Sequence, residues 1–275
     1  MNKTGFIGFG AMGGIIAEAL VKNNAIPAGK IVLNTRTPSK MKSFLERYPE
    51  AEAAGSVQAL AGKCSRIFIC TGTKEVKAVV EELVGYLQEN AHLITITGII
   101  EMKCLESIFT GAITRIMPTQ IAEAGEGVTL ILHNAKVASG ERELIRKAFS
   151  KIGRVKEITE SQMDLAADLA SCAPAFYAAI LKHVVAAAEK HGGMAEKDIR
   201  EISLATAEGT IKLLTDRNLG FEELIRRVAT PGGITEEGVK ILDRALPAVF
   251  NEVFTTTLSK REKLRKQMCE QYGVV

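Results

Sequence analysis

Thr4-Gly5-Phe6-Ile7-Gly8-Phe9-Gly10-Ala11-Met12-Gly13 is a short apolar run that ends in glycines, and a helical pattern follows at once through Leu20. Gly8, Gly10 and Gly13 fit the pattern G-x-G-x-x-G between a strand and a helix. In this pattern the first glycine permits a sharp turn, the second lets a pyrophosphate approach the backbone, and the third lets the helix pack on the strand. The N–H groups of the first helical turn then face the phosphates.

We therefore expect a dinucleotide site in this stretch, rather than a glycine-rich turn without a ligand. The expected cofactor-binding residues of the stretch are Gly8, Gly10, Ala11, Met12 and Gly13. The end of the next apolar run predicts which dinucleotide binds. An acidic residue usually meets the ribose 2′-hydroxyl of NAD there, but this chain has Asn34, with Arg36 and Thr37 close behind. Positive charge and hydroxyl donors favour NADPH, although residues 37–39 also suit a helix start, and both roles are compatible.

Length, charge and cysteine spacing narrow the class of protein. The chain has 275 residues, enough for one or two domains, and a net charge of +3, which argues for neither nucleic acid nor a membrane surface. Five dispersed cysteines indicate reduced thiols and no zinc site. No signal-peptide pattern and no apolar stretch of about 18 residues is evident, so we expect a soluble cytoplasmic protein without a metal.

Further apolar runs alternate with helical patterns through the first half of the chain. Strands are predicted at residues 66–70, 92–97, 112–118, 127–132 and 154–158, and helices at 74–88 and 140–152. This alternation predicts a doubly wound, mostly parallel sheet of the Rossmann type. Ligands bind such a sheet at the carboxyl ends of its strands. The residues placed near the cofactor on this ground are Thr71, Gly72, Thr97, Gly98, Pro118 and Thr119.

Strand patterns stop after about residue 159. The helices expected beyond it cover residues 161–170, 173–191, 197–217, 220–228 and 235–266. We predict a dinucleotide-binding domain over residues 1–158 and an all-helical substrate and dimerisation domain over 159–275. Ala166–Ala188 is apolar on most faces, which favours burial against another subunit and hence a homodimer. The basic run Lys260–Lys266 is expected to be a solvated helix end.

Two loops outside the glycine pattern are candidates for chemistry. Residues 115–120 leave a strand towards the cofactor side, although a strand-terminating turn explains them equally well. Residues 229–237 lie between two helices and contain Pro231-Gly232-Gly233. Successive backbone N–H groups there form an anion pocket suited to a carboxylate, and Thr235 is placed to hydrogen-bond a substrate nitrogen. The alternative is an ordinary helix start with Thr235 as its N-cap.

Taken together, these segments resemble the pyrroline-5-carboxylate reductases over nearly the whole chain. The family's glycine pattern is matched at 7–13, and its Asn-Arg pair by Asn34 and Arg36. The segments that match its Arg-x-Met-Pro, Gly-Glu-Gly, Ser-Gly-Ser-Gly-Pro-Ala-Tyr and Ser-Pro-Gly-Gly-Thr-Thr motifs are Arg115–Ile121, Gly125–Gly127, Ala170–Phe176 and Thr230–Thr235. This resemblance implies an NADPH-dependent reduction of a cyclic imine, most simply 1-pyrroline-5-carboxylate to L-proline.

The resemblance also implies roles for individual residues. Thr235 matches the threonine that contacts the imine nitrogen, so it is the expected catalytic residue. The expected substrate-binding residues are Gly232, Gly233, Ile234 and Cys172. The alternative for Cys172 is a structural role as a small packing residue. The chain departs from the family motifs at Thr119, Ile121, Ala170–Ala173 and Ile234, and these departures leave open which cyclic imine fits.

Two other hypotheses about the function are compatible with parts of the sequence. The opening residues 5–13 also resemble a 3-hydroxyacid dehydrogenase, whose catalytic lysine lies early on the first long helix after the sheet. Here the first lysine of that helix, Lys182, comes nine residues after Ala173, which is too far along. The altered substrate loops also permit a regulatory protein that binds NADP without catalysis. Turnover with a cyclic imine, turnover with a hydroxyacid only, or tight binding without turnover separates the three.

Overall fold

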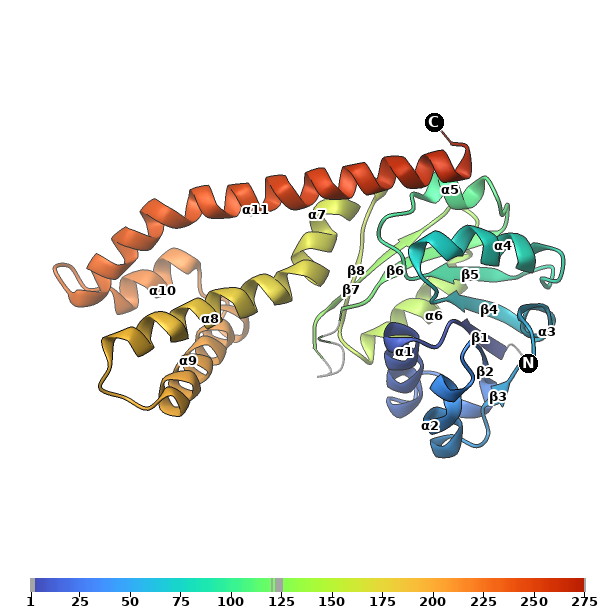
Figure 1. The fold of residues 1–275 in the computed structure, drawn as a ribbon, viewed down its shortest axis with the longest axis horizontal. Helices are drawn as coiled ribbons and strands as arrows, with labels where there is room; N and C mark the ends of the chain where they lie inside the picture. The colour runs from blue at the N-terminus through green and yellow to red at the C-terminus, as the bar shows by residue number, and fades with distance from the viewer. Residues whose placement is uncertain (1–2, 120, 122–125, 275) are drawn as a thin grey trace. The chain divides into compact units, whose positions relative to one another are not determined.

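The computed structural model describes residues 3–119, 121 and 126–274, and its centre is an eight-stranded sheet (Figure 1). The strands are β1 Lys3–Ile7, β2 Ile31–Asn34, β3 Glu52–Ala53, β4 Cys64–Ile69, β5 His92–Thr95, β6 Ala112–Met117, β7 Val128–His133 and β8 Arg154–Glu157. They lie in the order β3-β2-β1-β4-β5-β6-β7-β8. All neighbours are parallel except β6 and β7, which run antiparallel. The doubly wound, mostly parallel sheet predicted from the sequence is therefore confirmed.

Strand β1 is the point at which the order of the strands reverses. Its last residue, Ile7, pairs with Asn34 of β2 on one side and with Ile69 of β4 on the other. The chain builds β2 and β3 outward on the first side and then returns to build β4 to β8 on the second. A crevice forms at the carboxyl ends of strands where such a reversal occurs, and ligands of open α/β sheets bind there.

Helices cover both faces of the sheet. They are α1 Ala11–Lys22, α2 Ser39–Arg47, α3 Val57–Lys63, α4 Val76–Val84, α5 Met102–Glu106 and α6 Ser139–Ser150, with short 3₁₀ turns η1 Ala28–Lys30 and η2 Thr73–Glu75. Because side chains alternate along a strand, Phe6 packs with α1, α2 and α6, while Ile7 packs with α3, α4 and α5. Figure 1 shows α1, α2 and α6 on one side of the sheet and α4 and α5 on the other.

The remainder of the described chain is helical. Its elements are η4 Glu160–Gln162, α7 Met163–Ala167, a π-helical turn Asp168–Cys172, α8 Ala173–His191, α9 Glu196–Asp216, α10 Phe221–Val228 and α11 Ile234–Tyr272. Two compact units result, one of residues 1–171 with 258–275 and one of residues 172–257. The helical C-terminal part agrees with the sequence expectation, and the division at 158/159 stays a prediction.

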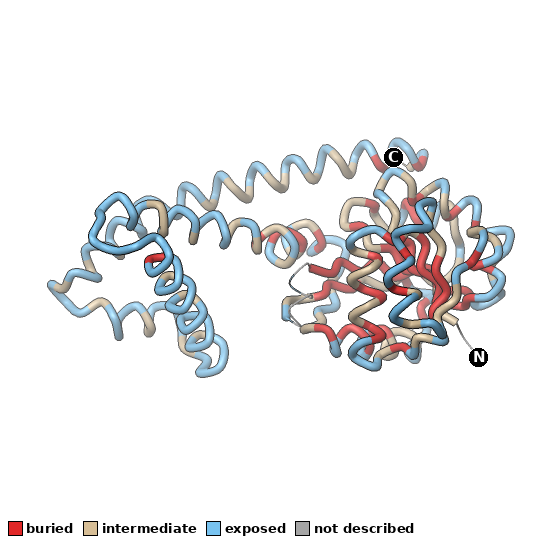
Figure 2. Tube along the Cα trace, turned by 60° about the horizontal axis from the view of Figure 1, so that its bottom comes forward, coloured by how far each residue is buried: buried red, intermediate tan, exposed pale blue. Residues whose placement is uncertain are grey.

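The two units differ in how much they bury. In Figure 2 the buried residues gather in and around the sheet. Within residues 172–257, all of which are described, only Ala173 and Ile199 are buried. One helical run, Glu160–His191, is long and apolar enough to cross a membrane by length and composition, although the sequence pattern predicts no such segment. Such a run also suits a helix covered by a partner subunit.

The C-terminal end of α11 corrects one expectation. Arg261, in the basic run expected to be solvated, pairs with the buried Asp168 at 2.7 Å. Arg265 pairs with Asp164, and its Nε lies 3.2 Å from Glu101. Met268 and Tyr272 one and two turns further on are buried against α4 and α5. These four side chains attach α11 to the sheet unit, a role that a basic pattern alone does not reveal.

Two smaller features of the sheet were also missed. The two-residue strand β3 has no apolar run to mark it, because it pairs only at the outer edge of β2. The predicted strand at 127–132 is present as β7, but it runs antiparallel to its neighbour β6. A hydrophobic run predicts a strand and does not predict its direction.

Candidate functional site

The three glycines of the β1–α1 turn carry different physical constraints. Gly8 has a φ of +86°, and a Cβ there would lie 2.9 Å from the carbonyl group of Cys70. A Cβ on Gly13 would lie 2.4 Å from the carbonyl oxygen of Gly8. Gly10, by contrast, has open space, with no atom within 4 Å of where its Cβ would be. Folding therefore requires Gly8 and Gly13, whereas Gly10 leaves room beside the backbone.

Gly10 is also the N-cap of α1, and no side chain caps the first turn of this helix. N–H groups at an uncapped helix start attract anions, and the helix dipole adds to this attraction. The turn thus provides the two properties that a pyrophosphate needs: space beside the backbone, and unfilled donors.

A cleft of about 540 Å³ lies next to this turn, at the carboxyl ends of β1, β2 and β4. It brings together seven of the predicted cofactor residues: Gly8, Gly10, Asn34, Arg36, Thr37, Thr71 and Gly72. The hydroxyl oxygen of Thr71 is buried and has no hydrogen-bond partner among the described residues. A ligand with polar groups would supply one. The cleft therefore fits a dinucleotide in size, position and donors.

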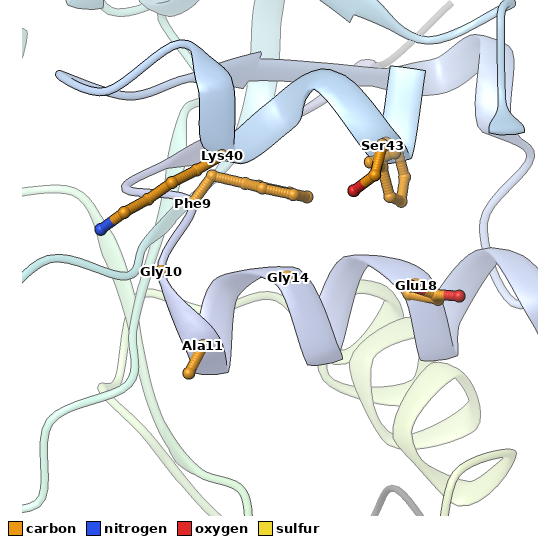
Figure 3. Close-up of a pocket in the computed structure, with 8 residues that line it drawn as sticks. Phe9, Gly10, Ala11, Gly14, Glu18, Lys40 and Ser43 are labelled. Atoms are coloured by element: carbon orange, nitrogen blue, oxygen red, sulfur yellow. The ribbon is translucent and has the colours of Figure 1, made fainter. Parts of the chain in front are cut away.

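A second cavity of about 370 Å³ lies between α1 and α2 and shares Phe9, Gly10 and Lys40 with the cleft. Ala11 lines it as well. Figure 3 shows Gly10 and Ala11 at the start of α1, with the ammonium of Lys40 on their side of the cavity and pointing away from Ser43. The cation of Lys40 is thus placed beside the turn that is expected to hold phosphate.

The cleft is also lined by two acidic side chains, Glu75 and Glu82, that the sequence pattern does not predict. Glu75 Oε1 lies 2.5 Å from Arg36 Nη2, and Glu75 Oε2 accepts a hydrogen bond from the N–H of Gly72 at 3.1 Å. Glu82 accepts a hydrogen bond from Gln58 at 2.7 Å. No local pattern points to Glu75, since its contact with Arg36 spans 39 residues.

Other predicted residues have structural partners or lie outside the cleft lining. The amide of Asn34 donates to the carbonyl oxygen of Ala54 at 3.0 Å, which holds the chain beyond β3. Met12, Thr97 and Pro118 are not among the residues that line the cleft. Thr97 and Pro118 follow β5 and β6, at the same edge of the sheet as the cleft. Their cofactor contacts stay predictions.

Cys70 lines the cleft but is not suited to nucleophilic chemistry. Burial raises the pKa of its thiol to about 12, so the thiol stays protonated at neutral pH.

A buried arginine lies in β6, within the stretch 115–120 that the sequence singles out as a candidate for chemistry. Arg115 is 1% exposed, forms an ion pair with Glu160, and donates to the carbonyl oxygen of Gly98 at 3.3 Å. It therefore ties β6 to the loop after β5 and to the start of the helical part. Thr119, which follows, is buried as well. Gln120 and Gly125, named in the predicted motifs, lie outside the described residues.

The turn before α11 uses two of its backbone N–H groups within the chain, and that of Gly233 donates to the carbonyl oxygen of Thr230 at 2.9 Å. Gly232 has a φ of +72°, and a Cβ on Gly233 would lie 2.6 Å from the hydroxyl oxygen of Thr230. The N–H of Gly232 donates to a carboxylate oxygen of Glu236 at 2.8 Å. This backbone hydrogen bond, together with the charge of Lys240, lowers the pKa of the Glu236 carboxyl. The turn therefore does bind a carboxylate, and that carboxylate belongs to its own helix.

Thr235 lies in the first turn of α11, which begins at Ile234. It is therefore inside the helix, and the alternative role as N-cap is not what the structure has. Ile234 and Thr235 are both exposed, so their side chains are accessible to a substrate or a partner subunit. Cys172 is half-buried at the junction between the π-helical turn and α8. Whether Cys172 contacts substrate stays a prediction.

One group of potential metal ligands occurs among the described residues. Glu101, Cys104 and Cys269 place their ligand atoms within 4.8 Å of one another. Glu101 already pairs with Lys103 and Arg265, each at 3.2 Å. Burial and a hydrogen bond with Cys269 raise the pKa of the Cys104 thiol to about 12. A carboxylate with two cationic partners and a protonated thiol make a poor cation site, so we assign no metal to it.

Comparisons with known proteins match both halves of the chain. The family model for NADP oxidoreductase, coenzyme F420-dependent, covers residues 3–98, and that for pyrroline-5-carboxylate reductase dimerisation covers residues 160–264. Pyrroline-5-carboxylate reductase 3 of Bacillus subtilis is 33% identical over 98% of this chain and 100% of its own.

Solved structures agree in fold. A pyrroline-5-carboxylate reductase from Coxiella burnetii superimposes with a TM-score of 0.87 at 22% identity, over 96% of this chain and 98% of that one. The Plasmodium falciparum pyrroline carboxylate reductase with NADP bound superimposes with a TM-score of 0.80 at 23% identity, over 96% and 97%. At 22–23% sequence identity, these superpositions show that the fold is shared.

Proposed function

The chain belongs to the pyrroline-5-carboxylate reductase family, and from this premise we propose that it catalyses the NADPH-dependent reduction of 1-pyrroline-5-carboxylate to L-proline, a step of proline biosynthesis. The observation that carries the proposal is similarity over the full length of a reductase, together with a dinucleotide cleft at the reversal point of the sheet. A 3-hydroxyacid dehydrogenase or a binding-only protein has no comparable observation in its favour.

The cofactor half of the site rests on residues that fit NADPH. We propose that the uncapped start of α1 at Gly10, Ala11 and Met12 holds the pyrophosphate, and that Arg36 and Thr37 hold the 2′-phosphate. Thr71, whose hydroxyl has no partner among the described residues, is available to the same ligand. When bound, NADPH supplies the hydride that adds to the imine carbon.

The substrate half rests on the turn before α11. The N–H of Gly232 already donates to a carboxylate oxygen, that of Glu236, which supports carboxylate binding at this turn. We propose that the backbone of Gly232, Gly233 and Ile234 holds the substrate carboxylate and that the hydroxyl of Thr235 holds the ring nitrogen. The chain's contribution to the reaction is then orientation of a small anionic ring, because the cofactor carries the redox chemistry.

The helical part supports homo-oligomerisation, since residues 160–264 match a dimerisation family model. We propose that the protein is a homodimer in the cytoplasm. Its subunits would associate through the helical domain that we place after residue 158. Within residues 172–257 only Ala173 and Ile199 are buried, which is too little apolar burial to stabilise 86 residues by themselves. We therefore propose that a partner subunit buries the exposed apolar side chains of these helices. The same subunit contact would explain the apolar run Glu160–His191 without a membrane.

The test is an assay of NADPH oxidation with 1-pyrroline-5-carboxylate, other cyclic imines and hydroxyacids, each with NADPH and NADH. We expect turnover with 1-pyrroline-5-carboxylate and little with hydroxyacids. Tight NADPH binding without any turnover would replace the proposal with the binding-only alternative.

Thr235→Ala is the matching site test. Loss of one hydrogen bond to the reacting nitrogen should lower kcat/KM by about 10- to 100-fold while the NADPH Kd stays within about twofold. Thr256→Ala, at an exposed threonine further along α11, is the control and should leave both unchanged. An undiminished rate in Thr235→Ala would remove this residue from the site.

A further inference from the structure

The cofactor cleft is lined by acidic as well as basic side chains, so its net positive charge is small. Arg36, Lys40 and Lys74 line the cleft, but so do Glu75 and Glu82. Arg36, with a side chain 86% exposed, is held by Glu75 at 2.5 Å. No ion pair to Lys40 or Lys74 is found in the described part of the chain, so these two cations are not neutralised in the same way.

Glu75 is fixed in place from its own side of the cleft. One carboxylate oxygen accepts the N–H of Gly72, which closes the 3₁₀ turn η2 at the end of β4. The other oxygen reaches across to Arg36, which follows β2. This backbone hydrogen bond, together with the pair to Arg36, holds the carboxylate beside Arg36 in the structure.

This position matters for the choice between the two nicotinamide cofactors. NADPH differs from NADH by one phosphate on the adenosine ribose, and Arg36 is the arginine at the strand end that meets this ribose. A phosphate that takes Arg36 must break or share its pair with Glu75, and it brings its negative charge close to that carboxylate. NADH has only a hydroxyl at this point, which can donate a hydrogen bond to a carboxylate.

We propose that Glu75 is a specificity-determining residue of the cofactor site, one that competes with the 2′-phosphate for Arg36 and so narrows the difference in affinity between NADPH and NADH. The inference rests on the proposed function for the identity of the cofactor. Lys40 and Lys74 keep the cleft attractive to phosphate, so NADPH binds in spite of Glu75. Glu75 thus supplies, from the β4 side, the acidic group that is missing after β2, where Asn34 stands.

The test is Glu75→Gln, with Kd values for NADPH and NADH measured by cofactor fluorescence. Glutamine keeps an oxygen acceptor for the N–H of Gly72 and loses only the charge, so the 3₁₀ turn is retained. We expect the NADPH Kd to fall about three- to tenfold and the NADH Kd to change less than about twofold. Glu81→Gln is the matched control: it removes the same charge from α4 outside the cleft lining and should leave both Kd values unchanged.

A double-mutant cycle with Arg36→Ala locates the effect. If Glu75 acts through Arg36, then Glu75→Gln in the Arg36→Ala background should change the NADPH:NADH ratio less than about twofold. An unchanged ratio in Glu75→Gln alone, or the same gain with Arg36 absent, would overturn the inference. Binding is measured without an imine, so failure of 1-pyrroline-5-carboxylate to react would count against the proposed reduction and not against the role of Glu75.

Discussion

At the scale of single residues, the glycine pattern contains two kinds of glycine that a sequence does not distinguish. Gly13 is required by contact with the carbonyl oxygen of Gly8, 2.4 Å from where a Cβ would lie, and Gly10 has no such contact. Gly13→Ala should therefore destabilise the fold by about 1–3 kcal/mol, the usual cost of overpacking. Gly10→Ala should leave the unfolding temperature nearly unchanged and weaken NADPH by about tenfold or more, because the methyl group takes the space of the pyrophosphate.

Thermal unfolding and NADPH titration of the two variants check this prediction. Gly55→Ala is a useful control, since its Cβ would also meet open space but lies away from the cleft lining. A large loss of stability in Gly10→Ala with normal NADPH affinity would mean that Gly10 serves the fold and not the ligand.

The sequence predicts the cations and glycines of the site better than its acids. Gly8, Gly10, Arg36 and Thr37 follow from spacing, because the strand–turn–helix order places them at one edge of the sheet. Glu75 lies on a different strand connection, and only the order of β2, β1 and β4 brings it to Arg36. Arg115 shows the reverse case: its motif suggests loop chemistry, but the residue is buried in the sheet.

At the scale of elements, strands β5, β6 and β7 are joined by a buried polar chain. The hydroxyl of Thr114 lies 2.6 Å from His92 Nε2 and 2.7 Å from His133 Nδ1. With one proton, this hydroxyl donates to one ring nitrogen and accepts from the other. Burial, together with the charge of Arg142, lowers the pKa of His133 to about 4 from its ordinary 6.5.

A pH dependence of stability follows from His133. The unfolded chain takes up a proton on this ring near pH 6.5 and the folded protein only near pH 4. Between these values the unfolded state binds more protons, so stability falls as the pH is lowered through the interval. At about 1.4 kcal/mol per pH unit, this interval gives a loss of at most about 3.5 kcal/mol, reduced by solvent screening.

Urea unfolding between pH 7 and 4 measures this slope, and His133→Gln should flatten it. Glu141 does not confuse the result. The ring of His92, 3.5 Å away, and the hydrogen bonds from Arg66 lower the pKa of its carboxyl to about 2 from 4.5, so its contribution is lost only as the pH falls below about 4.5. An identical slope in His133→Gln would show that the ring does not titrate as described.

The first turn of α11 makes a second prediction at this scale. Glu236 occupies the N–H of Gly232, a donor that the proposed substrate carboxylate would use. Glu236→Ala should free this donor and lower the KM for 1-pyrroline-5-carboxylate by about two- to fivefold. The control is Glu237→Ala in the same turn, which removes an acid that pairs with Lys240 rather than with the turn. A raised KM in Glu236→Ala alone would mean that Glu236 shapes the pocket instead of filling it.

At the scale of the whole molecule, the alternation of strands and helices predicts the sheet, and its loss after residue 159 predicts the helical part. The β6–β7 reversal and the edge strand β3 could not be predicted, because both depend on pairing rather than on apolar pattern. The attachment of α11 through Arg261 and Arg265 depends on acids about a hundred residues or more away. Long-range pairing is thus what the sequence does not reveal.

The helices of residues 172–257 bury too few apolar side chains to be stable in a single chain, so we expect a second subunit to cover them. Large apolar side chains are exposed along α8, α9, α10 and α11, among them Tyr177, Ile211, Phe221 and Ile241. We expect sedimentation velocity at micromolar concentration to give at least twice the 29.7 kDa of one chain. The double variant Ile241→Lys with Tyr177→Lys should shift the measured mass toward that of one chain and lower the unfolding temperature, because subunit association stabilises the fold.

The control is Ser259→Lys, also on α11 but outside residues 172–257, which should change neither the mass nor the unfolding temperature. A stable 29.7 kDa species in the unmodified protein would contradict the proposed dimer, and it would require these apolar side chains to be covered within one chain.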